Sequence, residues 1–275
     1  MYGLDKIVSV PPAKLPLGEF NARHYYAEKI RTALTDIGFS EVYTSSFRNQ
    51  DVVKLENALA TDKGYLRSSL VENIKEARTN NVPHRDLLGL PAIKIFEIGT
   101  VFLEDSEEFR VAIAVQSGTA YKAKLDDVLL AEAIEAINTA CGVEIKPLYQ
   151  NEGVVEFSLE SLLALTKPVT AYDAAPATST GVYKAFSNYP SVSRDVAMWV
   201  GEGESVDKVS KLILAVAGDL CVRLTHLDTF TKEGRTSLAF RLVFQADDRT
   251  LTDTEIEPVM AAIYDAIKQA GFEPR

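Results

Sequence analysis

Residues 237–245 read Ser-Leu-Ala-Phe-Arg-Leu-Val-Phe-Gln, with an apolar side chain at every even-numbered position. This period of two predicts a strand that buries one face against a core. The opposite, open face then carries Ala239, Arg241, Val243 and Gln245. The same parity, applied to an expected strand over residues 192–200, buries Val196, Met198 and Val200 and leaves Ala197 and Trp199 on the open face.

The segments on either side of this stretch predict a complete small domain. A helix begins after the capping residue Ser205, and a strand over 221–230 follows it. Thr252-Asp-Thr-Glu255 has the pattern of a capping box and predicts a second helix. A short last strand over 272–275 completes the order β-α-β-β-α-β, which is that of a ferredoxin-like domain. Pro274 suits an edge strand only.

The first part of the chain predicts helices and a hairpin. Apolar side chains at helical spacing predict helices over 20–37 and 130–141, each followed by a glycine. Ser69-Leu-Val-Glu72 resembles a capping box and predicts a helix that ends before Pro83. The other expected elements are a strand over 41–47, a short helix capped by Asn49, a hairpin of 93–102 and 109–115 joined by the acidic residues 104–108, a strand over 154–157 and a short helix from Ser158.

Residues 166–190 have the composition of a linker. They contain three prolines, Gly181 and a run of small residues. We expect a domain boundary near residue 185, which divides the chain into domains 1–184 and 185–275.

Composition excludes several classes of protein. The 275 residues carry a formal charge of −10, which argues against non-specific binding to DNA or to an anionic membrane. No apolar run reaches the roughly 18 residues of a membrane span, and no secretory signal is present. The two cysteines, Cys141 and Cys221, form no disulfide framework, which indicates a reducing compartment. We expect a cytoplasmic protein.

Motifs of catalysis and metal binding are missing from the sequence. The three histidines, His24, His84 and His226, stand apart, and no HExxH, GxSxG or P-loop pattern occurs. The acidic run 104–108 could hold a metal, but a solvated hairpin tip is the simpler interpretation. We expect no catalytic residue and no metal site.

The open face of the second domain is the candidate binding surface. Trp199 and Arg241 would lie on it, and aromatic rings and guanidinium planes stack on unpaired bases. The basic residues at strand ends and turns, where phosphates would be within reach, are Arg194, Lys232, Arg235 and Arg249. The alternatives are that Trp199 is buried against the other domain or a loop, and that each arginine is a solvated charge.

Three motifs in the second domain resemble a known family. They are Tyr189-Pro-Ser-Val-Ser-Arg-Asp-Val-Ala197, the stretch 237–245 and Arg249-Thr-Leu-Thr-Asp253. In this order they are similar to the ferredoxin-fold anticodon-binding domain that ends the β subunit of bacterial phenylalanyl-tRNA synthetases.

The preceding part of the chain resembles the catalytic-like module of the same subunit. The motifs are Tyr2-Gly-Leu-Asp-Lys-Ile7, Leu66-Arg-Ser-Ser-Leu70 and Ile95-Phe-Glu-Ile-Gly-Thr-Val-Phe102. The resemblance implies an α+β fold, with a class II synthetase-like antiparallel sheet and flanking helices followed by a ferredoxin-like βαββαβ domain. The stretch 143–152 is shorter than its counterpart in the family.

The resemblance also implies that the first module is inert. In active class II synthetases a Phe-Arg-x-Glu turn places an arginine on the α-phosphate of ATP, an electrostatic role that an apolar group cannot take. The matching run here is Phe102-Leu103-Glu104-Asp105, so Leu103 replaces the arginine. We therefore expect no aminoacyl-adenylate chemistry and no cofactor in this chain, with ATP and magnesium bound elsewhere in the whole enzyme.

The function that the resemblance implies is that of a non-catalytic part of a phenylalanine–tRNA ligase β subunit. Such a part pairs with the catalytic α subunit in a heterotetramer and binds the anticodon region of tRNA(Phe), with no DNA or membrane partner. Helices 20–37 and 69–82 are candidates for the α contact, and internal packing is the alternative. Because the family's upstream domains do not precede Met1, we expect an engineered start. The competing functions are a free-standing RNA-binding or regulatory paralogue and a genuine class II ligase.

Overall fold

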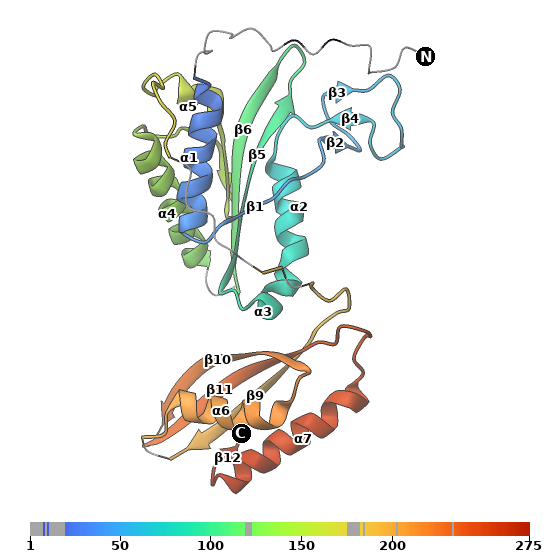
Figure 1. Cartoon of the computed structure of the whole chain (residues 1–275), viewed down its shortest axis with the longest axis vertical. Coiled ribbons are helices and arrows are strands. Elements are labelled where there is room, and N and C mark those ends of the chain that lie inside the picture. The colour runs from blue at the N-terminus through green and yellow to red at the C-terminus, as the bar shows by residue number, and fades with distance from the viewer. Residues whose placement is uncertain are drawn as a thin grey trace.

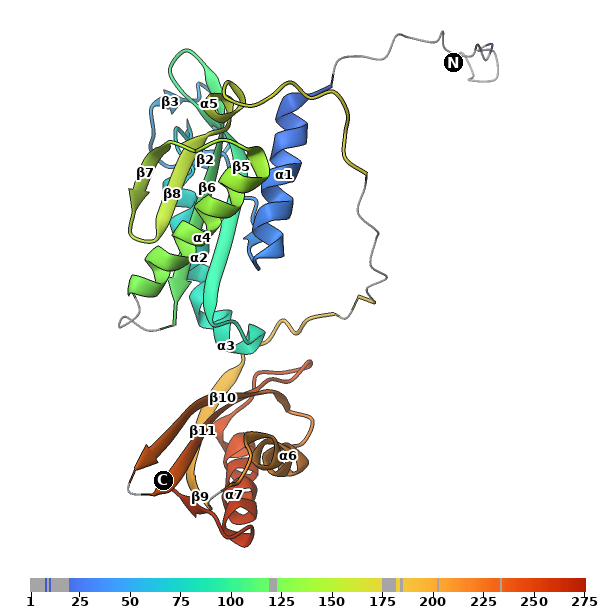
Figure 2. The ribbon, with the colours of Figure 1, turned by 90° about the vertical axis from the view of Figure 1, so that its left-hand side faces the viewer.

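The computed structural model describes residues 8, 10, 20–118, 123–174, 182–183, 185–201, 203–232 and 234–275. Two bodies lie end to end along the long axis of the molecule (Figures 1 and 2). The first contains the elements from α1 to α5, and the second contains those from β9 to β12. The motif at residues 2–7 lies outside the described residues.

The first body is built on a five-stranded sheet. Its strand order is β1-β5-β6-β8-β7, with β1 parallel to β5 and the remaining neighbours antiparallel. The strands are β1 (Ser40–Glu41), β5 (Ala92–Phe102), β6 (Glu107–Ser117), β8 (Val154–Ser158) and β7 (Pro147–Asn151). The expected hairpin of two long strands is confirmed, and β7 was not predicted.

Helices cover both faces of this sheet. On one face lie α1 (Ala22–Asp36), α4 (Ala123–Cys141) and α5 (Leu159–Leu163), which share a core with Phe96 and Ile113. On the other face α2 (Val71–Asn81) packs through Ile74 against Ile95 and Ala114. Figure 1 shows α1 and α4 on one side of β5 and β6, and α2 on the other. This two-sided burial explains why long runs of β5 and β6 are continuously buried instead of alternating between buried and exposed residues.

The end of α2 differs from the expectation. The α-helix stops at Asn81, before Pro83, as predicted. The chain nevertheless stays helical through η2 (Val82–His84) and α3 (Arg85–Leu88). Proline is tolerated here because it stands in the first turn of the new segment, where its missing N–H has no helical partner. Gly89 ends α3 with a φ of 68°, a left-handed conformation that favours glycine.

The capping box expected at the start of α2 is wrong. Ser69 does accept a hydrogen bond from the Val71 N–H, but the N-cap residue is Leu70, without a side-chain cap. The carboxylate of Glu156, on β8, instead accepts from the Leu70 N–H at 2.6 Å and from the Ser69 hydroxyl at 3.0 Å. Glu72 forms an ion pair with Lys75 on the helix surface. A residue 86 positions away in the sequence therefore replaces the local cap.

The expected strand over 41–47 and the short helix after Asn49 are also wrong. The first strand ends at Glu41, because Thr44 turns away to donate from its hydroxyl to Glu97 at 2.6 Å. Asp51 accepts from the backbone of Val52 at 2.8 Å and of Ser68 at 3.0 Å, which fixes a turn in place of a helix. A small three-stranded sheet results, in the order β2 (Phe47–Arg48), β4 (Tyr65–Leu66) and β3 (Val53–Lys54).

The second body has the predicted ferredoxin-like order. Its sheet runs β10-β11-β9-β12, with every neighbouring pair antiparallel. The strands are β9 (Val192–Val200), β10 (Cys221–Lys232), β11 (Arg235–Phe244) and β12 (Glu273–Pro274). The helices α6 (Val206–Ala217) and α7 (Asp253–Gln269) share one core with Met198 and Phe240. Pro274 lies on an edge strand, as predicted.

The start of α7 leads to a prediction of pH dependence. The carboxylate of Glu255 accepts from the Thr252 N–H at 3.0 Å and from Arg249 Nε at 2.9 Å. The Thr252 backbone, followed by Arg249, lowers the pKa of Glu255 from 4.5 to about 2. Because the pKa is lower in the folded state, the contribution of Glu255 to stability is complete above pH 4.5 and is lost as the pH falls through about 2.

We expect Glu255→Gln to be less stable than the parent chain at pH 7, with the difference shrinking between pH 4.5 and 2. Thermal unfolding at stepped pH measures it. A stability difference of the same size at pH 2 and pH 7 would contradict the assignment.

Candidate nucleic-acid interface

The strand pairing of the second sheet builds one row of side chains across its open face. Trp199 on β9 stands opposite Ser237 on β11 and Glu273 on β12. Ser237 in turn stands opposite Phe230 on β10. The parity predicted from the sequence is confirmed on β9, where Val196 and Met198 are buried against the helices and Trp199 is only partly buried.

Two arginines complete this row. The Arg235 guanidinium lies over the indole of Trp199 at 5.0 Å, and that of Arg275 lies 5.5 Å from the same ring and 5.6 Å from the ring of Phe230. The Arg235 side chain is 54% exposed and also forms an ion pair with Glu273. Two aromatic rings, each with an arginine guanidinium over it, therefore lie at the end of the open face where β10 turns into β11. Below we call Trp199, Phe230, Arg235 and Arg275 the aromatic–arginine cluster.

Arg241 lies on the same face but is not free to act in the same way. Asp195 receives a bidentate pair of hydrogen bonds from it, both at 2.7 Å, and Asp86 of the first body receives a third at 3.0 Å. The hydrogen bonds to Asp195, and then the charge of Asp86, raise the pKa of Arg241 above its ordinary value. An incoming phosphate would have to compete with two carboxylates for this guanidinium.

Val243 corrects the predicted open face. Its position on β11 was expected to be uncovered, yet its side chain is 0% exposed. Its cross-strand partner Arg223 donates to the Leu87 carbonyl of the first body. The nearby Arg241 donates to the Asp86 carboxylate of the same body. The first body therefore contacts one end of the open face. The other end, which carries the aromatic–arginine cluster, has no such contact among the described residues.

The remaining predicted residues lie away from the cluster, with one exception. Arg194 lies on the opposite face of β9 from its neighbour Asp195. It forms an ion pair with Asp253, at the start of α7, at 2.5 Å. Arg249 is half-exposed and binds Glu255 at 2.9 Å and Asp248 at 2.8 Å. Lys232 is the exception, since it ends β10 directly opposite Arg235. Of the six predicted residues, the structure thus brings Trp199, Arg235 and Lys232 to one end of the open face.

Phe230 and Arg275 were not predicted. Phe230 could have been found by extending the parity argument to β10, because residues paired across neighbouring strands share a face. No alternating pattern in the sequence indicates the position of Arg275. Its backbone N–H bonds to the Ala197 carbonyl at 2.8 Å, and this pairing beyond β12 brings its side chain over the rings.

The first sheet carries a buried ion pair on the face toward α2. Arg67 Nη1 donates to Glu97 Oε1 at 2.7 Å, and the two side chains are 3% and 0% exposed. Arg67 also donates to the Thr44 hydroxyl at 2.9 Å and to the Thr100 carbonyl at 3.0 Å. A Cβ at Gly99 would lie 2.4 Å from Arg67 Nη2, so a glycine is needed to admit the guanidinium. The side chain of Arg67 therefore fills the space above this part of the sheet.

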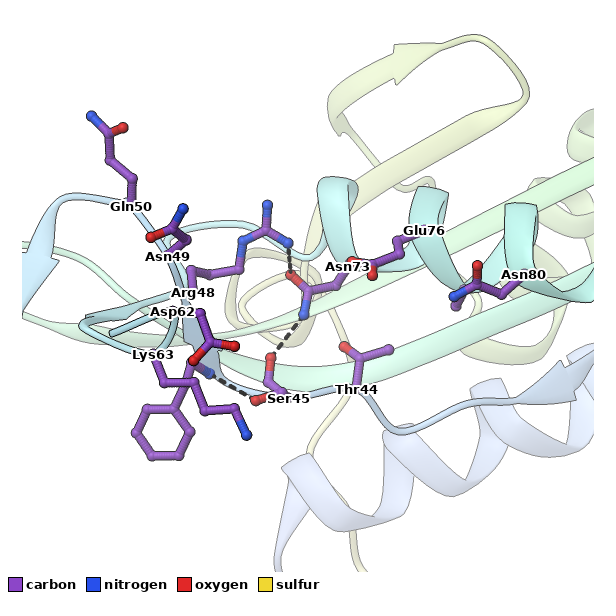
Figure 3. A pocket seen from close by; sticks show the side chains of 12 residues that line it. Thr44, Ser45, Arg48, Asn49, Gln50, Asp62, Lys63, Asn73, Glu76 and Asn80 are labelled. Carbon is purple, nitrogen blue, oxygen red and sulfur yellow. Dashed lines mark hydrogen bonds between the residues drawn. The ribbon is translucent and has the colours of Figure 1, made fainter. Parts of the chain in front are cut away.

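A polar groove of about 730 Å³ lies beside this pair, between the small sheet and α2 (Figure 3). Arg48 donates to the Asn73 side chain at 3.0 Å, and Asn73 donates to the Ser45 carbonyl at 2.7 Å. The charged side chains lining the groove are Arg48, Lys63, Asp62 and Glu76. Two cations and two anions cancel, so the groove gives no net attraction for a polyphosphate.

The acidic hairpin tip is solvated, as expected. Residues 104–107 are exposed, and Glu108 forms an ion pair with Arg110 at 2.8 Å. Within the described ranges, no group of three or more histidine, cysteine or acidic side chains is arranged to hold a metal ion. Among the helices of those same ranges, none combines the length and apolar character of a membrane span.

Two family matches cover the two bodies. Residues 187–275 match the ferredoxin-fold anticodon-binding domain, and residues 8–151 match the family described as phenylalanyl tRNA synthetase beta chain CLM domain. The helix-flanked, largely antiparallel sheet and the anticodon-binding domain after it place this chain in the class of aminoacyl-tRNA synthetase subunits. Within that class, this chain belongs to the phenylalanyl-tRNA synthetase β-chain family. The predicted α+β fold is confirmed.

Relatives agree with this assignment. The phenylalanine–tRNA ligase β subunit of Chromobacterium violaceum is 24% identical over 98% of this chain and 39% of its own length. That of Solibacter usitatus is 26% identical over 100% of this chain and 40% of its own length. The β subunit of Symbiobacterium thermophilum is 40% identical over 34% of this chain and 11% of its own. The chain thus spans about two fifths of the relatives that align along its whole length.

Among solved structures, the histidyl-tRNA synthetase of Nostoc aligns with 46% of this chain and 35% of its own at 17% identity, with a TM-score of 0.30. A similarity of this size supports no conclusion.

Proposed function

We propose that this chain is the part of a phenylalanine–tRNA ligase β subunit that helps to assemble the enzyme and contacts the anticodon region of tRNA(Phe). The aromatic–arginine cluster is the observation that carries the proposal. Partly exposed aromatic rings and the guanidinium planes beside them are surfaces on which unpaired bases stack. Arg235 and Lys232 stand at the rim of this surface, where phosphates would pass.

Electrostatics restrict how tightly the second domain can bind alone. Residues 185–275 contain more acids than bases, and Asp195 and Asp86 already neutralise Arg241. Binding by the separate chain should therefore be weak and should fall as salt is raised. In the assembled enzyme, contacts elsewhere on the tRNA would add to it.

The first module is proposed to act as a structural partner without its own adenylate chemistry. Leu103 supplies no charge at the hairpin position where active class II enzymes hold the ATP α-phosphate. The face of the sheet toward α2 holds the Arg67–Glu97 pair, so its polar groups are satisfied internally. ATP and magnesium are proposed to bind elsewhere in the whole enzyme, and the cytoplasm is the proposed compartment.

The catalytic α subunit is the proposed protein partner. Of the two candidate helices, α2 is packed on the sheet through Leu70, Val71 and Ile74. Helix α1 is also packed on the sheet, on the opposite face, and Tyr172 from the segment after α5 lies against it, with ring centroids of Tyr172 and Tyr25 6.3 Å apart. We propose that the α contact includes this aromatic side of α1.

Co-expression with the matching α subunit tests this assignment. We expect a stable complex that survives gel filtration, and we expect no ATP–pyrophosphate exchange by the chain alone. A folded chain that fails to bind α, or that catalyses exchange without it, would contradict the proposal. The exchange result would also separate it from a genuine class II ligase.

A free-standing RNA-binding paralogue is the less favoured alternative. The β subunits of Chromobacterium violaceum, Syntrophus aciditrophicus and Solibacter usitatus align with 98–100% of this chain, and the chain corresponds to about two fifths of each of them.

A further inference from the structure

The two bodies meet at a small polar contact that the function proposed above does not use. It joins the α3 corner, Arg85–Gly89, to the covered end of the open face (Figures 1 and 2). Arg241 donates to Asp86 at 3.0 Å, and Arg223 Nε donates to the Leu87 carbonyl at 2.8 Å. Both arginines lie on the face of the sheet that also carries Trp199, because Arg223 pairs with Val243 and Arg241 pairs with Asp195.

The α3 corner is shaped to receive these arginines. The Arg223 guanidinium packs directly against the backbone of Gly89, where a Cβ would lie 2.4 Å from Arg223 Nη1. Asp86 is held between Arg241 and Arg85, which donates to it at 3.1 Å. Val243, which pairs with Arg223 across the strands, is fully buried at this end of the face.

The contact is nevertheless weak enough to open. The Asp86 and Arg241 side chains remain 30% and 26% exposed, and partly exposed ion pairs contribute little net stability. Between α5 and β9, the residues that the structure describes form no regular helix or strand. Interfaces of this kind between domains usually permit relative motion.

We propose that the α3 corner is a releasable latch that competes with RNA phosphates for Arg223 and Arg241. In the latched state, carboxylate and carbonyl oxygens of the chain occupy the two guanidinium groups. A polyanion that takes their place frees the second body to move and extends the open face from the aromatic–arginine cluster to Arg241. The RNA part of this inference rests on the proposed function.

The latch predicts that loosening it should favour RNA binding. Asp86→Asn removes the charge that holds Arg241 across the contact but leaves Asp195 in place. We expect a larger radius of gyration by small-angle X-ray scattering and faster amide exchange over residues 85–89 in the variant. A short RNA stem-loop with an unpaired loop should bind roughly two- to fivefold more tightly, because less of the chain is held in the closed state. Glu144→Gln is the matched control, since Glu144 is exposed outside the contact and changes the net charge equally.

When the same RNA is added to the parent chain, we expect the radius of gyration of the protein and the rate of amide exchange over residues 85–89 to increase. RNA that binds without either change would overturn the latch and leave the proposed function standing. RNA that fails to bind at all would refute the proposed function, and the latch would then be decided by Asp86→Asn alone. An unchanged radius of gyration in that variant would overturn it.

Discussion

Replacing Arg67 with alanine is expected to lower the free energy of unfolding of the first body by about 3–5 kcal/mol. The variant leaves the Glu97 carboxylate, which is 0% exposed, without its cation. Thr44 would still donate to Glu97 from its hydroxyl and its backbone N–H, but two neutral donors do not offset the desolvation of a buried charge. The missing guanidinium also leaves an empty space above Gly99. Calorimetric unfolding, with amide exchange on β5 to assign the transition to this body, measures the loss.

Two further variants isolate the buried pair. Arg31→Ala removes ion pairs with Glu41, whose two carboxylate oxygens both accept from Arg31 Nε, and with Glu28. The Arg31 and Glu41 side chains are 32% and 36% exposed, so the variant should cost no more than about 1 kcal/mol. Arg67→Leu combined with Glu97→Leu removes both charges and should recover most of the loss seen with Arg67→Ala. Similar losses of unfolding free energy for Arg67→Ala and Arg31→Ala would contradict the claim that Arg67→Ala leaves an uncompensated buried charge on Glu97.

Replacing Trp199 with alanine is expected to have the largest effect on RNA. Loss of one stacked base costs roughly 1–3 kcal/mol, which corresponds to about a five- to 150-fold weaker binding. In the assembled enzyme, aminoacylation of tRNA should fall while ATP–pyrophosphate exchange stays unchanged. Trp199 also lies under Arg235 and Arg275, so the variant removes the surface that orients both guanidinium groups.

Leu214→Ala is a suitable control for Trp199→Ala. Leu214 is 48% exposed on α6, on the helix side of the second sheet, so its loss should leave aminoacylation unaffected. Equal aminoacylation by the Trp199 variant and the parent enzyme would remove this tryptophan from the interface.

The second domain could be predicted from the sequence because its determinants are local. Alternation over 237–245, caps at Ser205 and Thr252, and stops such as Gly218 each act over a few residues. The errors in the first body have the opposite origin. Thr44 leaves the expected strand because it binds Glu97, and the start of α2 is capped by Glu156, both from distant strands. No local pattern contains those partners.

The candidate interface divides in the same way. Parity placed Trp199 and Arg241 on the open face, but it could not show that Asp86 of the other body pairs with Arg241 or that Val243 is covered. Arg194 and Arg249 were selected for their position near strand ends, and both are instead paired with acids around the start of α7. Charge patterns in sequence indicate available cations without indicating their partners.

The emission of Trp199, the only tryptophan in the chain, tests the central claim most directly. An RNA stem-loop that carries the phenylalanine anticodon is titrated into the chain, and binding is followed independently by the anisotropy of a dye on the RNA. Base stacking on the indole predicts saturable quenching of the tryptophan emission in step with the anisotropy. RNA that binds while the emission of Trp199 stays constant, or RNA that does not bind, would contradict an RNA interface on this face.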